Sequence, residues 1–149
     1  MIVEKLTALG LELPDCPAPV ASYLPVQTAG KLIYASGQTA WVKGKLLYAG
    51  KVGDTVSVKE AYESAKLSAL NCLSAIAAVA DLDSIRIVRV TGYVNAAPEF
   101  GEQPMVINGA SELLQALYGE NGRHARSAIG VGSLPSNASV EIEIIAERL

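Results

Sequence analysis

The most regular pattern in the sequence is a strict alternation of apolar and polar residues near its end. Residues 139–147 alternate as expected of a strand with one buried face. One side carries Val140, Ile142, Ile144 and Ala146, and the other carries Glu141, Glu143, Ile145 and Glu147. Residues 85–94 predict a second strand, with Val88, Val90 and Val94 on one side and Ile87, Arg89, Thr91 and Tyr93 on the other.

Shorter apolar runs separated by glycine predict two hairpins. Residues 23–28 and 31–36 flank Gly30, and residues 41–43 and 45–48 flank Gly44. Glycine suits these positions because tight hairpin turns require positive φ angles. Residues 127–134 predict a further strand despite their two glycines.

Two longer stretches follow the 3.6-residue period of an amphipathic helix. The first begins at a capping box formed by Ser57 and Glu60. Cys72 falls on its apolar stripe, which favours a buried structural thiol over a reactive one. Pro104 and Gly119 mark the start and the end of the second helix. Its apolar face consists of Ile107, Ala110, Leu113, Leu114 and Leu117.

No linker or low-complexity run divides the chain, so residues 1–149 are predicted to form one domain, with residues 1–22 as an N-terminal lead-in. Within the lead-in, residues 3–9 predict a short helix, and Pro14, Pro17 and Pro19 impose an extended path. The order of elements predicts an α+β fold with both long helices on one face of a sheet.

The opposite face of that sheet would carry Ile87, Tyr93 and Ile145, and self-association of the chain would cover it. Composition is consistent with this, because 50% of the residues are hydrophobic and 18% are charged, against about 25% charged in average soluble domains. The apolar surplus indicates subunit interfaces, whose buried centres are more apolar than ordinary surface. The alternative is a core rich in alanine and valine, and composition does not separate the two.

Composition also limits the classes of function. The longest apolar run, residues 75–80, is far shorter than the roughly 20 residues of a membrane span, and the first residues lack the features of a secretory signal. We therefore expect a soluble, cytoplasmic protein with no membrane partner. The net charge of −3 argues against nucleic acid as a partner. Two cysteines and one histidine make no zinc site, and no phosphate-binding glycine motif is present, so no metal or cofactor is expected.

Polar residues with catalytic potential gather in residues 123–127 and on the last strand. Arg126 could grip a carboxylate or phosphate through two parallel hydrogen bonds, or could be an ordinary exposed charge. His124 could act as a general acid or base, but a lone loop histidine more often has no such role. Glu141 and Glu143, roughly 7 Å apart on one strand face, could form an acid–base pair or a solvated face.

The residues at these positions resemble a known family. Tyr34-Ala35-Ser36-Gly37-Gln38 is similar to its S-G-Q segment, and Ala125-Arg126-Ser127, Leu134-Pro135 and residues 140–146 are similar to its C-terminal signature. The family is RidA (YjgF), which comprises enamine/imine deaminases also called L-PSP endoribonucleases. The resemblance covers residues 20–147, with His124 where the family usually has proline and Ala128 where it often has cysteine.

The resemblance implies a chorismate-mutase-like (bacillus-type) α+β fold. It also implies a homotrimer whose sheets form a central barrel, with sites in the clefts between subunits. In these sites, Arg126 would bind the substrate carboxylate and Glu141 would position the attacking water. The implied substrate-binding residues are Tyr23, Ser36, Gly37, Asn108 and Ser127.

The activity implied by the resemblance is metal-free hydrolytic deamination of reactive 2-enamine or 2-imino acids to a 2-keto acid and ammonia, without a cofactor. Two other functions remain open. One is the endoribonuclease or translation-inhibitor activity of the older family name, against which the acidic net charge argues. The other is a non-catalytic trimer that binds a small carboxylate-bearing metabolite in the same cleft.

Overall fold

The computed structural model describes residues 1–16, 18 and 21–149, so the extended path predicted at Pro17 and Pro19 lies outside the described residues. The strands are β1 (Val26–Ala29), β2 (Leu32–Gln38), β3 (Trp41–Val42), β4 (Lys45–Leu46), β5 (Ile85–Asn95), β6 (Ala125–Val131) and β7 (Val140–Arg148). The α-helices are α1 (Ile2–Ala8), α2 (Val58–Ala77) and α3 (Gln103–Tyr118). Short 3-10 helices are η1 (Leu82–Ser84), η2 (Gly119–Gly122) and η3 (Pro135–Asn137).

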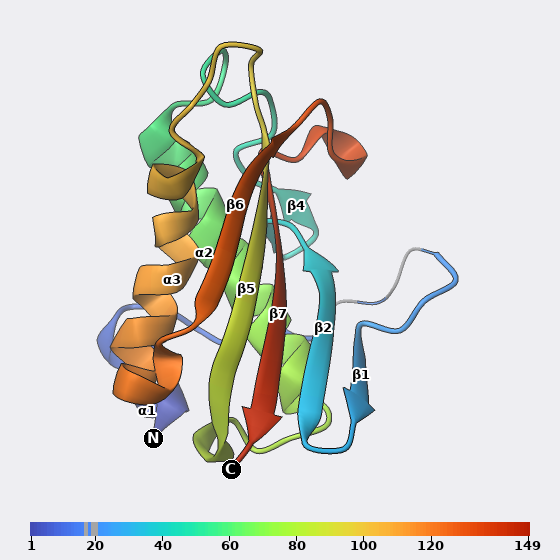
Figure 1. Ribbon diagram of the computed structural model, residues 1–149, viewed down its shortest axis with the longest axis vertical. Helices are drawn as coiled ribbons and strands as arrows, with labels where there is room; N and C mark the ends of the chain where they lie inside the picture. Colours follow the sequence, from blue (N-terminus) through green and yellow to red (C-terminus); the bar gives the residue numbers. More distant parts are fainter. Residues whose placement is uncertain (17, 19–20) are drawn as a thin grey trace.

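Five strands form one mixed sheet in the order β1-β2-β7-β5-β6 (Figure 1). Neighbouring strands are antiparallel except β5 and β6, which run parallel and are connected through α3. β3 and β4 form a separate hairpin. Both predicted hairpins are confirmed: Gly30 and Gly44 have φ angles of 59° and 78°. The first strand, however, begins at Val26 rather than at residue 23.

Both long helices cover one face of this sheet, so the predicted α+β architecture is confirmed (Figure 1). α2 packs on β2 and β7, and α3 packs beside it on β5 and β6. α1 is tied to the end of α3 by Lys5, whose Nζ donates to the Leu117 carbonyl at 2.8 Å. In the described part of the chain, no helix has both the length and the apolarity needed to cross a bilayer.

The helix ends follow local sequence signals. Ser57 N donates to Glu60 Oε1 and Glu60 N donates to Ser57 Oγ, both at 3.1 Å, so the predicted capping box starts α2. Pro104 lies in the first turn of α3, where its missing N–H leaves no bond unmade. Gly119 ends α3 with a φ of 58°. The predicted end of this helix is confirmed, and its start lies one residue before the predicted Pro104.

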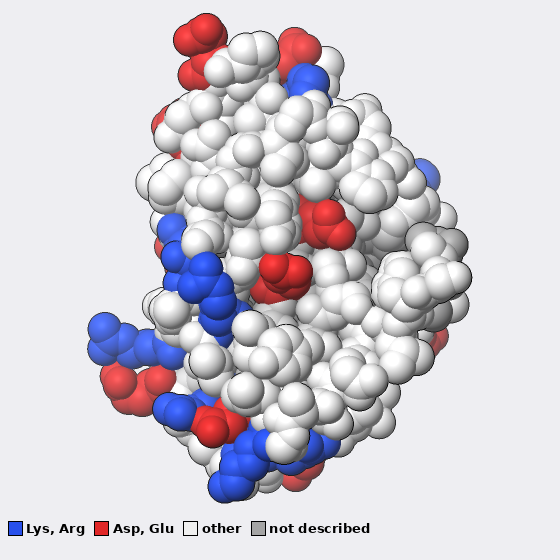
Figure 2. All heavy atoms as spheres, turned by 45° about the vertical axis from the view of Figure 1, so that its right-hand side comes forward, with Lys and Arg blue, Asp and Glu red and all other residues white. Residues whose placement is uncertain are grey.

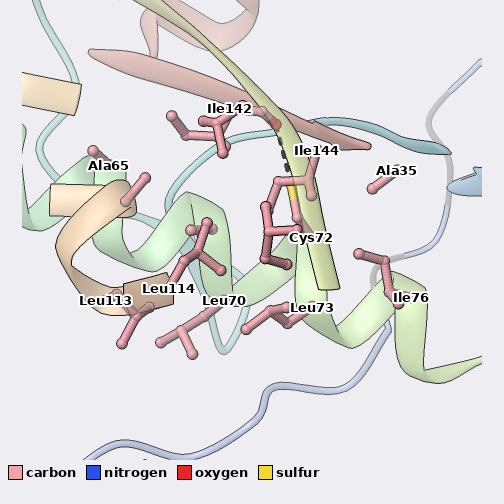
Figure 3. Close-up of a cluster of buried hydrophobic side chains, with 14 of the residues drawn as sticks. Ala35, Ala65, Leu70, Cys72, Leu73, Ile76, Leu113, Leu114, Ile142 and Ile144 are labelled. Carbon is pink, nitrogen blue, oxygen red and sulfur yellow. Dashed lines mark hydrogen bonds between the residues drawn. The ribbon is translucent and has the colours of Figure 1, made fainter. Parts of the chain in front are cut away.

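The centre of the core lies between β7 and α2 (Figure 3). Figure 3 shows Cys72 of α2 beneath the strand, with its Sγ donating to the Ile142 carbonyl at 3.1 Å. Complete burial raises the pKa of the Cys72 thiol well above its ordinary value. The prediction of a buried structural thiol is therefore confirmed.

A β-bulge in β5 changes the predicted face of one residue. The register of β5 against β7 shifts between Ile87 and Arg89, and a bulge of this kind reverses the alternation of side chains beyond it. Ile87 is therefore buried beneath the helices, and its prediction for the opposite face is wrong. Tyr93 and Ile145 lie on the opposite face, as predicted.

The sheet face without helices, called the open face below, carries exposed apolar side chains. Tyr34 and Ile129 are 42% and 45% exposed in the single chain. Tyr34 pairs in register with Ile145, and Ile129 pairs with Tyr93, so all four belong to this face. An apolar surface of this kind is typical of a region that another protein surface covers.

Candidate active site

A cavity of about 600 Å³ lies where β2 ends beside the start of β7. Four of the predicted site residues line it, namely Tyr23, Ser36, Gly37 and Glu141. The other lining residues are Ala18, Ala21, Gln38, Thr39, Trp41, Pro135, Ser136 and Glu143. Figure 2 shows acidic groups set in a hollow of a largely uncharged surface, with basic side chains to one side of them.

An irregularity between β2 and β7 brings Gly37 and Glu141 together. The register of the two strands shifts between Ala35 and Gln38, so the backbone around Gly37 leaves the regular ladder. A Cβ atom added at Gly37 would lie 2.9 Å from Glu141 Cδ, closer than real Cβ atoms approach their neighbours. The missing side chain at position 37 therefore leaves the space that the Glu141 carboxyl group occupies.

Ser36 ties the segment that carries Tyr23 to the end of β2. Its backbone N–H donates to the Pro25 carbonyl at 2.9 Å, and its hydroxyl donates to the Leu24 carbonyl at 2.5 Å. The hydroxyl oxygen of Ser36 keeps its acceptor capacity for a ligand. Tyr23 itself is exposed at the rim of the cavity.

Two carboxylates reach the cavity from β7. Partial burial raises the pKa of Glu141 above its ordinary value, and the nearby charge of Glu143 adds to this shift. Glu143 accepts a hydrogen bond from the Tyr93 hydroxyl at 2.9 Å, which raises the pKa of Tyr93. A raised pKa makes the Glu141 carboxylate a stronger base than an ordinary glutamate, which is a property expected of a residue that accepts a proton.

Arg126 belongs to a second group of polar residues, on the helix side of β6. Its Nη1 donates to Asn108 Oδ1 at 2.8 Å and to Ser111 Oγ at 3.2 Å. Its Nη2 donates to the Pro104 carbonyl at 3.4 Å. The structure thus brings the predicted residues Arg126 and Asn108 into direct contact.

These bonds leave part of the Arg126 guanidinium group available. The group has five N–H donors, and its three hydrogen bonds are all to α3. Within the described part of the chain, Nε–H and one Nη2–H of Arg126 remain uncommitted. Two such donors can bind a planar carboxylate through parallel hydrogen bonds.

Arg126 and Glu141 lie on opposite faces of the sheet. Arg126 pairs in parallel register with Val90, whose side chain is in the core beneath the helices. Glu141 pairs with Tyr93 on the open face, and β5 lies between β6 and β7. A single chain therefore does not bring the two predicted catalytic residues to one substrate.

Ser127 is separate from both groups. It alternates with Arg126 along β6 and pairs with Thr91, so its side chain is on the open face. Its hydroxyl oxygen accepts a hydrogen bond from Arg89 Nη2 at 2.7 Å. The substrate contact predicted for Ser127 stays a prediction.

Among the residues of these groups that were absent from the predicted site are Trp41, Glu143 and Ser111. Trp41 lines the cavity from the predicted hairpin of β3 and β4, but no local pattern indicates that this hairpin lies beside the site. Glu143 carried a signal, because it shares a strand face with Glu141. The sequence also contained a signal for Ser111, because it follows Asn108 by three residues on one helix, and residues at that spacing are neighbours on the helix surface.

Within residues 1–16, 18 and 21–149, no three or more side chains of histidine, cysteine, aspartate and glutamate form a cluster that could hold a metal ion. The cavity and the surroundings of Arg126 instead present carboxylate, hydroxyl, amide and guanidinium groups. These groups support acid–base chemistry and the binding of a small anion.

Comparison with known proteins identifies relatives over nearly the whole chain. The sequence model of a family described as "YjgF/chorismate_mutase-like, putative endoribonuclease" matches residues 3–148. Protein TCP17 of Trypanosoma cruzi is 37% identical over 149 residues, which cover 98% of this chain and 93% of that protein.

Two crystal structures share the fold closely. Protein Atu1372 from Agrobacterium tumefaciens, described as having unknown function, has a TM-score of 0.93 at 44% identity and covers 99% of this chain and 92% of its own. A protein from Shewanella oneidensis MR-1, described as "a putative endoribonuclease", has a TM-score of 0.95 at 34% identity and covers 99% of each chain.

Proposed function

This chain belongs to the YjgF/chorismate-mutase-like family, and on that premise we propose that it is a hydrolytic deaminase of reactive 2-enamine and 2-imino acids. The products are a 2-keto acid and ammonia. The observation that carries the proposal is the cavity lined by Tyr23, Ser36, Gly37 and Glu141, in which the pKa of the Glu141 carboxyl group is raised.

The proposed reaction uses Glu141 as both base and acid. Its carboxylate takes a proton from a water molecule as the water oxygen forms a bond to the carbon of the N-protonated imine, which gives a neutral carbinolamine. The protonated Glu141 then gives this proton to the carbinolamine nitrogen. The carbon–nitrogen bond breaks and ammonia leaves, and the hydroxyl proton of the carbinolamine passes to the Glu141 carboxylate as the carbonyl of the 2-keto acid forms. A carboxyl group with a raised pKa suits the role of base, because its carboxylate is a stronger base than that of an ordinary glutamate and so accepts the proton of water more readily.

Arg126 supplies the anchor in this proposal. Its uncommitted N–H donors bind the substrate carboxylate and hold the neighbouring imine carbon at a fixed place, which is the positioning that catalysis requires. A relative from Dermatophagoides farinae, 26% identical over 136 residues, is named 2-iminobutanoate/2-iminopropanoate deaminase. Escherichia coli TdcF, which shares the fold at 22% identity and a TM-score of 0.63, has been solved with bound serine, a small molecule with a carboxylate.

The proposal includes a homotrimer with sites between subunits. Its support is the placement of Arg126 and Glu141 on opposite sheet faces, since one substrate can reach both only if they come from different chains. The exposed apolar side chains Tyr34 and Ile129 give the open face a surface suited to burial between subunits. Light scattering tests this directly: a trimer is expected, and a monomer would contradict the shared site.

The test of the activity is an assay with 2-iminobutyrate generated in situ, following the loss of the imine. Wild type is expected to turn it over rapidly, and Arg126→Ala and Glu141→Gln are expected to abolish turnover above the spontaneous rate. Arg123→Ala is the matched control, because Arg123 is exposed and pairs with Glu120 rather than with α3. Turnover unchanged by all three substitutions would contradict the proposal.

Two other outcomes would favour the alternative functions. RNA cleavage by a nuclease-free preparation that survives Arg126→Ala would indicate the endoribonuclease activity of the family description. The net charge of −3 argues against it, because binding to nucleic acid calls for a clustered basic surface. Binding of 2-ketobutyrate without turnover of the imine would indicate a non-catalytic carboxylate-binding protein.

A further inference from the structure

His124 is linked to Arg126 by a continuous chain of hydrogen bonds. The ring Nδ1 of His124 lies 2.6 Å from the Gly122 carbonyl oxygen, and its Nε2 lies 2.9 Å from Ser111 Oγ. Arg126 Nη1 donates to the same Ser111 Oγ at 3.2 Å. Ser111 on α3 therefore stands between the ring and the guanidinium group.

The direction of each bond in this chain is determined by chemistry. A carbonyl oxygen only accepts, so Nδ1 of His124 carries a proton and donates to Gly122. In the neutral ring Nε2 is then an acceptor, and the Ser111 hydroxyl donates to it. The Ser111 oxygen is left to accept from Arg126. A neutral ring thus satisfies all three groups in one arrangement, whereas a charged ring would take from the Ser111 hydroxyl hydrogen its acceptor at Nε2.

The surroundings of the ring favour that neutral state. Burial lowers the pKa of His124, and the positive charge of Arg126 lowers it further, against an opposing contribution from the Gly122 carbonyl. Ser111 is buried, which keeps water from competing for its hydroxyl group. A protonated ring would turn Nε2 into a donor, which leaves the Ser111 hydroxyl hydrogen without that acceptor, and would place a second positive charge beside Arg126.

We propose that His124, acting through Ser111, is a positioning residue that fixes the rotation of the Arg126 guanidinium group and so directs its free N–H donors at the substrate carboxylate. This inference rests on the proposed function. Asn108 and Ser111, three residues apart on α3, hold Nη1 of Arg126, and the ring fixes which way the Ser111 hydroxyl points. The edge of the guanidinium group that carries the free Nε–H and Nη2–H is thereby already oriented before the substrate binds.

The first test is the tautomer of His124, measured by nitrogen-15 NMR of the ring at neutral pH. We expect a neutral ring with the proton on Nδ1, since the Gly122 carbonyl requires it. A ring protonated on Nε2, whether neutral or charged, would overturn the proposal. This measurement needs no substrate, so its result does not depend on the proposed function.

The second test separates KM from kcat. Ser111→Ala is expected to raise KM for the imino acid roughly 3- to 10-fold, the effect of one lost hydrogen bond, with kcat nearly unchanged. His124→Leu is expected to act similarly, and His124→Gln to recover affinity, because its side-chain amide again offers an acceptor to Ser111. Ser68→Ala is the matched control, since Ser68 is an equally buried helical serine that donates only to the Ser64 carbonyl of its own helix. An equal KM in Ser111→Ala and Ser68→Ala would overturn the proposal.

A third measurement keeps the inference testable if no deaminase activity is found. The dissociation constant of 2-ketobutyrate then replaces KM. If this ligand does not bind either, the proposed function fails, and the rate of rotation of the Arg126 guanidinium group, measured by NMR, decides the inference alone. Faster rotation in Ser111→Ala than in Ser68→Ala supports it, and equal rates overturn it.

Discussion

The carboxyl group of Glu141 rests on the backbone of Gly37. A Cβ atom at position 37 would meet Glu141 Oε1 and lie 2.9 Å from Cδ. The backbone there does not adopt the left-handed conformation that favours glycine, so the reason for glycine is space. Position 37 therefore sets where the carboxyl group of Glu141 can lie, in addition to the substrate contact predicted for it.

Gly37→Ala is expected to damage activity more than stability. The new methyl group displaces the Glu141 carboxyl group, and a displacement of about 1 Å of a catalytic group costs on the order of 10²-fold in rate. The backbone conformation accepts alanine, so the thermal midpoint is expected to change little. The matched control is Gly101→Ala, where a Cβ would meet no atom within 4 Å. Similar kcat values for the two variants would show that the carboxyl group is not held by position 37.

Glu141→Gln is expected to abolish turnover without loss of stability. Folding raises the pKa of this carboxyl group, so the folded chain binds more protons than the unfolded chain between the ordinary and the raised value. Stability contributed by Glu141 therefore falls as pH rises through that window. At neutral pH the uncharged amide escapes this cost, and the variant should unfold at the same temperature as wild type or higher.

The same pKa sets the acid limb of the wild-type activity profile. Activity should fall as pH drops through a value above 4.5, the ordinary pKa of glutamate, because the water-activating form is the carboxylate. Kinetic profiles and thermal unfolding at several pH values check both statements, with the exposed Glu99→Gln as the control. An acid limb below 4.5, or marked destabilisation by Glu141→Gln alone, would contradict them.

The sequence predicts this fold best where one period runs through a whole element. In β7 the alternation from Val140 onwards is unbroken, and both of its faces were predicted correctly. Ile87 was placed on the wrong face because the bulge beside it arises from pairing with β7, which is distant in sequence. The sequence of a strand alone does not show where pairing with a neighbouring strand introduces a bulge.

The candidate site shows the same limit. The resemblance to the family identifies Arg126 as a site residue. It does not say which face of the sheet the Arg126 side chain lies on, because β6 is an edge strand with small residues and its orientation depends on parallel pairing with β5. The link from Arg126 through Ser111 to His124 was not predicted, since it joins a strand, a helix and a loop. Such tertiary contacts depend on how α3 packs against β6, which local periodicity does not specify.

Arg126→Lys is expected to weaken substrate binding even though it keeps the positive charge. Lysine lacks the planar fork, so it loses both the hold from Asn108 and the paired bonds to a carboxylate. Hydrogen bonds to charged groups are worth about 1.5–3 kcal/mol, which corresponds to a KM increase of roughly 10- to 100-fold. Titration calorimetry with 2-ketobutyrate provides an independent check. Arg123→Lys should bind the substrate as wild type does. An Arg126→Lys variant with an equally small change in KM would contradict the role of Arg126 in binding the substrate carboxylate.

Mixed oligomers test whether one site is built from two chains. Arg126→Ala and Glu141→Gln subunits are each expected to be inactive alone, because each lacks one half of the site. Co-expressed with different tags and purified together, they should regain activity, since a chain with intact Arg126 can meet a neighbour with intact Glu141. In a cyclic trimer that contains both chain types, one interface of the ring brings the two intact residues together, so about a third of the sites would be complete.

The controls for this experiment are two-tag oligomers that carry the same variant on both tags, which should stay inactive. Mass spectrometry of the intact oligomer verifies that both chain types are present. If mixed oligomers were verified and remained inactive, Arg126 and Glu141 would have to act within one chain. Their placement on opposite faces of the sheet, with β5 between them, makes recovery of activity the expected result.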